Sequence, residues 1–155
     1  MKVYLIRHAE EGEDGGLSKK GQEQSLALAE WLKDKKIAAL YSSDRKRSRE
    51  AVEITAPNLK LEPQIIPHME EVRELEPLES IIEARGRAEG GLHFALAENP
   101  GRNIALVFHS KLIRQLLAEL GLREFVEGED LPNAGIVVLD YQDGKFKLAS
   151  YAIVP

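Results

Sequence analysis

Two hydrophobic patterns alternate along the chain: short continuous apolar runs, and longer stretches in which apolar residues recur with helical spacing. The short runs are typical of strands covered on both faces, and the longer stretches are typical of amphipathic helices. Strands are therefore predicted at residues 2–6, 38–41 and 103–108. Helices are predicted at residues 18–35, 45–56, 80–98 and 111–120.

Residues with strong capping preferences mark the ends of these helices. Ser18 is suited to cap the first helix through its hydroxyl group. Pro57 is expected to close the second helix after Ala56, because a proline disfavours helical geometry in the residue before it. Gly121 is expected to stop the last helix.

Two further segments have strand character. Residues 59–66 alternate apolar and polar side chains, and Pro63 within them predicts an edge strand. Residues 135–154 are predicted to form a β-hairpin that turns at Asp143-Gly144. Strand–helix alternation followed by a hairpin predicts an α/β fold. We expect a three-layer sandwich, with helices on both faces of a mostly parallel central sheet and an antiparallel hairpin at the C-terminal end.

Composition limits the organisation and the partners. The chain shows no repeat, low-complexity tract or linker, so a single domain spanning residues 1–155 is expected. The net charge of −5 argues against general nucleic-acid binding. No apolar run reaches the roughly 18 residues of a transmembrane helix, so no membrane association is expected. Met1 and Lys2 lead directly into the first predicted strand, which predicts no signal peptide and a cytoplasmic location.

Charged and titratable residues follow three of the predicted strands. Arg7 and His8 follow the first strand, Arg47 follows the serine-rich end of the second, and His109 and Ser110 follow the strand "NIALVF". In open α/β sheets, functional groups gather at the carboxyl ends of the strands. A lone histidine at a strand end is more often structural, but three such strand ends together predict one shared crevice.

This combination of residues suits phosphoryl chemistry. Two guanidinium groups match phosphate oxygens bidentately, and the N-termini of the following helices supply further N–H donors. A neutral histidine can accept a phosphoryl group, and positive neighbours lower its pKa. The run "RKRSR" at 45–49 is more typical of a solvated helix face or a nucleic-acid patch, although Asp44 and Glu50 on its flanks weaken the second interpretation.

The fragments "LIRHAE", "LYSSDRKRSREAVEI" and "NIALVFHS" resemble the histidine phosphatase superfamily, the phosphoglycerate mutase-like group, over nearly the whole chain. The short members, such as phosphohistidine phosphatase and alpha-ribazole phosphatase, are the most similar in kind. The resemblance implies that His8 is a phosphorylated nucleophile and that Arg7, Arg47 and His109 hold the phosphoryl group, with Ser110 as a further phosphate contact. Arg47 is favoured over its neighbours because the family places an arginine four residues after the second serine.

The sequence departs from the family pattern at a few positions. Ala9 stands where the family's R-H-G-E motif has glycine, and Ser110, followed by Lys111, replaces a second glycine. The stretch "EGEDGG" at 11–16 replaces a polar residue that often follows the motif. None of these changes removes a charged group to which the resemblance gives a catalytic role.

The resemblance also implies a carboxylic acid that protonates the leaving oxygen, in the loop "HMEEVRELEPLES". The phrase "VRELEPLE" is similar to the family's "LREIDFGDWE", which makes Glu74 the first candidate. Glu71 is the second, because "MEE" also fits the Leu-x-Glu signature. His68 and His93 have no such context, and the four histidines lack metal-ligand spacing, so no metal and no cofactor is expected.

Three functions remain open from the sequence. The first is hydrolysis of a phosphomonoester, either a phosphorylated small molecule or a phosphoprotein, through a phosphohistidine. The second is a phosphoglycerate mutase-type transfer, and the third is a non-enzymatic phosphate-binding or interaction domain. A nucleotide-binding domain is disfavoured, because neither glycine-rich phosphate motif occurs. The apolar terminal strands are compatible with a homodimer.

Overall fold

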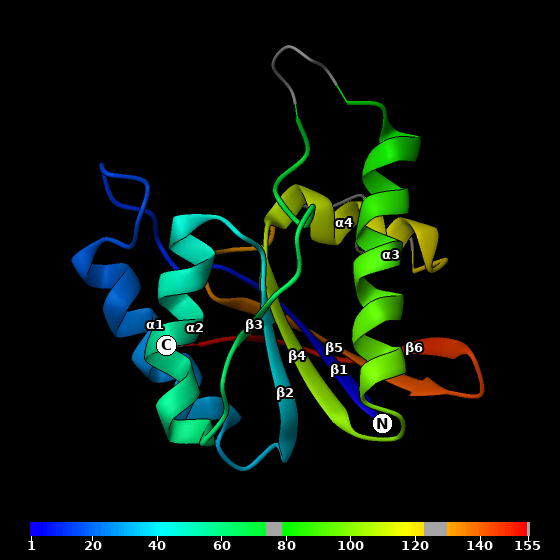
Figure 1. Cartoon of the computed structure of the whole chain (residues 1–155), viewed down its shortest axis with the longest axis horizontal. Coiled ribbons are helices and arrows are strands. Elements are labelled where there is room, and N and C mark those ends of the chain that lie inside the picture. The colour runs from blue at the N-terminus through cyan, green and yellow to red at the C-terminus, as the bar shows by residue number, and fades with distance from the viewer. Residues whose placement is uncertain (74–78, 123–129, 155) are drawn as a thin grey trace.

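One mixed sheet organises the computed structural model, which describes residues 1–73, 79–122 and 130–154. Its strands within these ranges are β1 (Lys2–Arg7), β2 (Ile37–Ser42), β3 (Gln64–Ile65), β4 (Asn103–Phe108), β5 (Gly135–Gln142) and β6 (Lys145–Ile153). They lie in the order β3-β2-β4-β1-β5-β6 (Figure 1). The first four strands of this order are parallel, and β5 and β6 add an antiparallel hairpin next to β1.

Two pairs of helices cover the sheet. They are α1 (Lys19–Leu32), α2 (Lys46–Leu59), α3 (Ile81–Glu98) and α4 (Ser110–Glu119). The apolar side chains of α1 and α2 pack on one face of the sheet, and those of α3 and α4 pack on the other (Figure 1). Strand β1 contributes side chains to the hydrophobic cores on both faces of the sheet. Val3 and Leu5 face α3 and α4, whereas Tyr4 and Ile6 face α1 and α2. The predicted three-layer α/β fold is therefore confirmed.

Capping follows the sequence closely at α1 and α3. The Ser18 hydroxyl accepts a hydrogen bond from the Gly21 N–H, and Ser80 forms a capping box with Glu83. Gly21 has a further role, because a Cβ there would lie 2.2 Å from the carbonyl oxygen of Glu10. The absence of a side chain thus lets α1 pack directly against the loop that follows β1.

Pro57 does not end α2, contrary to the prediction. The helix continues to Leu59 and closes at Lys60, which is left-handed (φ 56°) and donates its N–H to the carbonyls of Ala56 and Pro57. A proline in the last turn forfeits only its own backbone hydrogen bond, which the helix end tolerates.

The predicted edge strand is also shorter than residues 59–66. Only Gln64 and Ile65 pair with β2, as β3, although they do lie at the edge of the sheet. Leu59 is the last residue of α2 and Lys60 caps that helix, and the Leu61 N–H still donates to the carbonyl of Ala56. Pro63 has no N–H to offer a ladder, so pairing begins after it.

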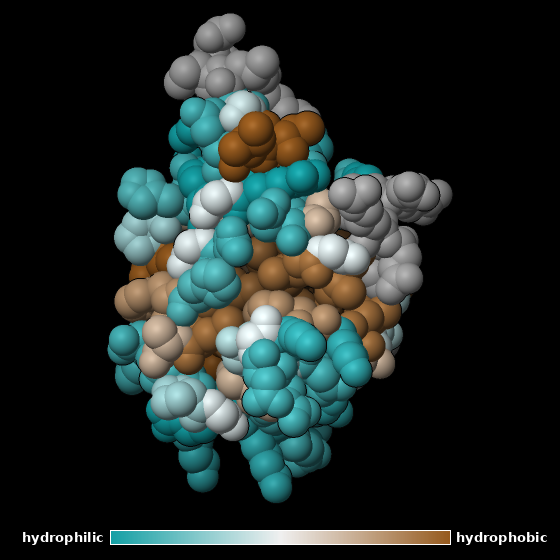
Figure 2. All heavy atoms as spheres, turned by 90° about the vertical axis from the view of Figure 1, so that its right-hand side faces the viewer, coloured by the Kyte–Doolittle hydropathy of each residue, from teal (hydrophilic) through white to brown (hydrophobic). Residues whose placement is uncertain are grey.

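The C-terminal hairpin turns at Asp143 and Gly144, both at positive φ (52° and 77°), as predicted. Figure 2 looks onto the side of the molecule where α3 and this hairpin lie, and it shows apolar residues gathered in the middle of that face. Tyr141, Phe146 and Leu148 are only partly buried against the core. Within the described ranges, none of the helices combines the length and apolar character needed to cross a membrane.

Candidate active site

The carboxyl ends of β1 and β4 bring two histidines together. These strands are parallel neighbours, with Arg7 in register with Phe108, and the His8 N–H donates to the Phe108 carbonyl at 2.9 Å. His8 and His109 therefore leave the sheet at the same edge, and their ring centroids lie 5.2 Å apart. The predicted convergence of these strand ends is found in the structure.

The side chain of His8 is a neutral imidazole with a defined tautomer. The residue is only 6% exposed, and its Nδ1–H donates to the carbonyl of Ala9 at 2.7 Å. Nε2 accepts a hydrogen bond from Nε of Arg47 at 3.1 Å, so the lone pair of Nε2 points toward a guanidinium group. Burial lowers the pKa of His8 to about 4 against the opposing effect of the bond to Ala9, and the charges of Arg47 and Arg7 lower it further.

His109 is fully buried behind His8. Its Nδ1 accepts from Nη2 of Arg47 at 3.4 Å, and its Nε2 lies 2.9 Å from the Ser43 hydroxyl, to which it donates in that tautomer. Burial lowers the pKa of His109 to about 2, helped by the neighbouring His8 and Arg47. Both imidazoles are thus neutral at physiological pH.

Arg47 links the two histidines from the first turn of α2. Besides both rings, its guanidinium group contacts the carboxylate of Glu11, with Nη1 and Oε1 3.3 Å apart. Arg45 and Arg49, its neighbours in the run of basic residues, are exposed. The spacing argument that selected Arg47 therefore agrees with the placement of the three side chains.

Two further donors face this region without a protein partner. Arg7 donates through Nη1 to the carbonyl of Leu131, but its buried Nε has no hydrogen-bond partner among the described residues. The hydroxyl of Ser110, at the start of α4, is likewise buried and unpartnered within the described ranges. Because buried donors are nearly always satisfied, these atoms are suited to an anion held at the N-terminus of α4.

Glu71, one of the two candidate acids, lies at the start of α4. Its carboxylate accepts hydrogen bonds from the N–H groups of Lys111 (3.0 Å) and Leu112 (2.8 Å). The N-cap residue His109 makes no such bond with its own side chain, so Glu71 supplies the cap from a distant segment. Glu74, the first candidate from the sequence, lies outside the described residues.

Sequence reasoning missed the contact of Glu11 with Arg47. It treated the stretch 11–16 only as a departure from a motif. In the structure an isolated antiparallel β-bridge between the backbones of Glu11 and Leu17 closes this loop. The carboxylate of Glu11 contacts the guanidinium group of Arg47. The unusual density of acidic residues so soon after a basic strand end was the available signal.

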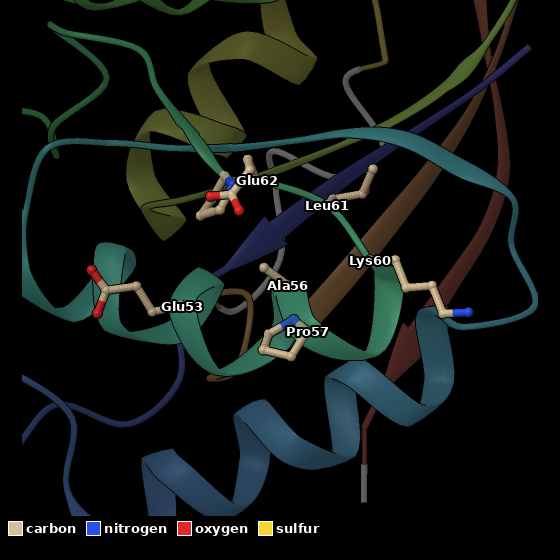
Figure 3. Close-up of a pocket in the computed structure, with 7 residues that line it drawn as sticks. Glu53, Ala56, Pro57, Lys60, Leu61 and Glu62 are labelled. Carbon is tan, nitrogen blue, oxygen red and sulfur yellow. The ribbon is translucent and has the colours of Figure 1, made fainter.

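No cluster of three metal-ligating side chains occurs within the residues that the structure describes. An open hollow of about 670 Å³ lies at the opposite end of α2 from Arg47 (Figure 3). It is lined by Glu53, Ala56, Pro57, Lys60, Leu61, Glu62 and Pro63, none of which belongs to the predicted site.

The chain is similar to known proteins along nearly its whole length. The model of the histidine phosphatase superfamily (branch 1) matches residues 3–76 and 73–154. A probable phosphoglycerate mutase, GpmB of Cronobacter sakazakii, is 25% identical, with 99% of this chain and 91% of that protein covered.

Solved structures of phosphatases share the fold. A mycobacterial glucosyl-3-phosphoglycerate phosphatase has a TM-score of 0.80 at 18% identity, covering 96% of this chain and 97% of that one. A phosphoserine phosphatase from Entamoeba histolytica has a TM-score of 0.81 at 19% identity, covering 97% and 95%. With the family model matched along almost its whole length, the chain belongs to the histidine phosphatase superfamily, and phosphoryl transfer is the chemistry that this membership implies.

Proposed function

We propose that this protein hydrolyses phosphomonoesters through a covalent phosphohistidine on His8. The observation that carries the proposal is the state of His8: a neutral ring whose Nδ1–H is fixed on the Ala9 carbonyl and whose Nε2 lone pair faces Arg47. In the first step Nε2 forms a bond to phosphorus while the ester P–O bond breaks, and the leaving oxygen takes a proton from an acid. In the second step water attacks phosphorus while the P–N bond to His8 breaks, and the conjugate base of the acid takes a proton from the water.

The neighbouring groups would stabilise the charge on the transferring phosphoryl group. Arg7 and Arg47 supply two guanidinium groups, and a bound phosphate would take over donors of Arg47 that now face Nε2 of His8 and the carboxylate of Glu11. The Nε of Arg7 and the hydroxyl of Ser110, which have no partner among the described residues, would add hydrogen bonds, and the ring of His109 lies 5.2 Å from that of His8. This set of donors lets charge be compensated by side chains, so the proposed reaction uses no metal.

A mutase is the second candidate, because the GpmB relative is named a probable phosphoglycerate mutase. A mutase returns the phosphoryl group to a substrate hydroxyl, whereas a phosphatase gives it to water. The short connection between β3 and α3 favours an open site and therefore water, and it would admit a phosphorylated small molecule or a phosphoprotein. A homodimer and a cytoplasmic location remain expectations.

Metal chelation and vanadate together test the proposed charge compensation. Phosphate release from a panel of phosphomonoesters should persist in EDTA, because side chains replace a metal as the counter-charge. Vanadate should inhibit by occupying the phosphoryl pocket. The same protein should show little mutase activity with phosphoglycerates in a parallel assay.

The proposal has distinct ways to fail. Complete loss of activity in EDTA, with recovery on adding Mg²⁺, would indicate a metal-dependent phosphatase. Faster mutase turnover than phosphate release would favour the second candidate. Turnover of no phosphoester at all would leave only phosphate binding.

The protonation of His8 gives a second prediction. Because burial and two arginines hold its pKa at about 4, His8 stays neutral at physiological pH and is protonated only as the pH falls through that value. A ¹⁵N NMR titration should therefore show an unprotonated Nε2 from about pH 8 to about pH 5, through the range where an ordinary histidine titrates. Arg47→Met should raise the pKa, since it removes a positive neighbour. A wild-type titration near the ordinary value contradicts this account.

A further inference from the structure

The segment of residues 68–73, which carries the candidate acid Glu71, and the residue Glu79 are fastened to α3 by the side chain of Arg87. Its Nη1 donates to the backbone carbonyls of His68 (2.5 Å) and Glu70 (3.0 Å). Its Nε and Nη2 donate to the two carboxylate oxygens of Glu79 at 2.5 and 2.8 Å. The same guanidinium group thus holds the start of the segment and Glu79.

Glu79 in turn makes two hydrogen bonds to Arg73, a residue of the same segment. Its side chain is fully buried, and its carboxylate also accepts from the N–H of Arg73 at 3.2 Å. The backbone N–H of Glu79 donates in turn to the Arg73 carbonyl at 3.1 Å. Bidentate hydrogen bonds between charged groups are among the strongest and most directional in proteins, so this joint is stiff. Removing Arg87 would leave the buried Glu79 carboxylate with the more exposed Arg73, 3.5 Å away, as its counter-charge among the described residues.

A second contact fastens the segment independently of charge. Met69 is only 2% exposed and lies against Gly91 of α3, where an added Cβ would come 2.4 Å from the methionine sulfur. A Cβ at the adjacent Gly90 would meet open space. Two neighbouring glycines of one helix therefore differ sharply in what a methyl group would displace.

Between these fastening points, the chain reaches across to α4. The carboxylate of Glu71 lies 3.0 Å from the backbone nitrogen of Lys111, on the turn that follows His109. This contact joins the segment to the helix that begins at the proposed phosphoryl site. A shift of the segment along α3 would move the carboxylate with it.

We propose that Arg87 is a positioning residue for proton transfer: by fastening residues 68–73 to α3, directly and through Glu79, it holds the carboxylate of Glu71 on the turn that follows His109. The inference rests on the proposed phosphatase function. Arg87 need not touch the substrate, since its bonds go to the segment and not to the reacting atoms. A displacement of about 1 Å in a catalytic group can cost about 10²-fold in rate, so loosening the joint should be felt in the step that needs the proton.

The test compares two leaving groups in Arg87→Met, which keeps the apolar stem and removes the charge. Hydrolysis of glycerol phosphate, whose alkoxide needs a proton, should slow about 10- to 100-fold in kcat. Hydrolysis of p-nitrophenyl phosphate should slow less than about threefold, because nitrophenolate leaves without one. Vanadate inhibition should be unchanged, since the groups of the phosphoryl pocket lie on other segments.

Matched variants separate positioning from general damage. Arg85→Met is the control on the same helix, because Arg85 bonds to Gln115 instead of the segment. If Arg87→Met does not fold, Gly91→Ala tests the same joint through Met69, with Gly90→Ala as its control. Gly91→Ala should reproduce the contrast between leaving groups, and both control variants should lack it.

The outcomes are distinguishable. The inference is overturned if a folded Arg87→Met slows both substrates equally, weakens vanadate inhibition in parallel, or leaves both rates unchanged while the wild type is active. An unfolded Arg87→Met together with a Gly91→Ala variant that shows no contrast also overturns it. A wild-type protein that hydrolyses neither substrate overturns the phosphatase function itself.

Discussion

Replacing His8 with alanine should reduce phosphate release by about 10³- to 10⁶-fold, the scale seen when the central member of a catalytic unit is lost. The reason is that Nε2 of His8 is the atom proposed to bond to phosphorus, whereas the ring of His109 is fully buried, with its Nδ1 against Arg47. His109 lies behind His8, with its Nε2 against the Ser43 hydroxyl. Rapid quench of the wild type with labelled substrate should trap a phosphoryl-protein that is acid-labile and base-stable.

Folding should survive the change, which makes the loss interpretable. The His8 backbone N–H, not its side chain, bonds to β4, so the sheet is retained in the alanine variant. His93→Ala is the matched control, because its side chain is exposed on α3, near Glu89. A fully active His8→Ala protein, or a phosphoryl group trapped on it, would end the phosphohistidine mechanism.

The acid should reveal itself through the leaving group. Glu71→Gln should slow hydrolysis of an alkyl phosphate by about 10²- to 10⁴-fold and that of p-nitrophenyl phosphate much less. Glu71 is the candidate that the structure places, with its carboxylate held on the turn that follows His109, whereas Glu74 lies outside the described residues. In this contact Oε2 accepts a single hydrogen bond from the described residues, from the Lys111 N–H, and keeps a lone pair for a proton.

Glu74→Gln is the comparison that decides between the two glutamates. This substitution should slow the hydrolysis of both substrates by a similar, small factor. If Glu74→Gln shows this contrast between leaving groups and Glu71→Gln does not, Glu74 is the acid, as the family phrase implied. The role of His8 is unaffected by that result. If neither variant shows it, the proton comes from another group.

Much of the fold could be predicted because its strands have unambiguous patterns. β1 and β4 are apolar on both faces, so their continuous runs identified them, and β4 matched the prediction at both ends. The end of α2 could not be read from Pro57, since a proline in a last turn is compatible with both stopping and continuing. The length of β3 could not be predicted for the same reason, because it depends on the residue at which α2 ends.

Some contacts of the candidate site could likewise be predicted from the sequence, and others could not. The convergence of His8 and His109 follows from parallel strands, whose carboxyl ends must meet at one edge. The contacts of Glu71 and Glu11 could not be predicted in the same manner. They depend on how a loop folds back onto a helix start or a guanidinium group, and such contacts have no periodic signal in the sequence. Each also lies in a stretch crowded with acidic residues, where sequence alone ranks several carboxylates equally.

The strand order has a consequence for how the molecule assembles. β1 is the first strand to be synthesised, yet it lies between β4 and β5, whose residues span 103–108 and 135–142. Its apolar run therefore has no neighbouring strand until most of the chain has left the ribosome. During that time two unpaired strand edges are exposed, the situation in which growing chains aggregate or recruit chaperones. The proposed nucleophile, His8, is therefore made well before the strands on both sides of β1.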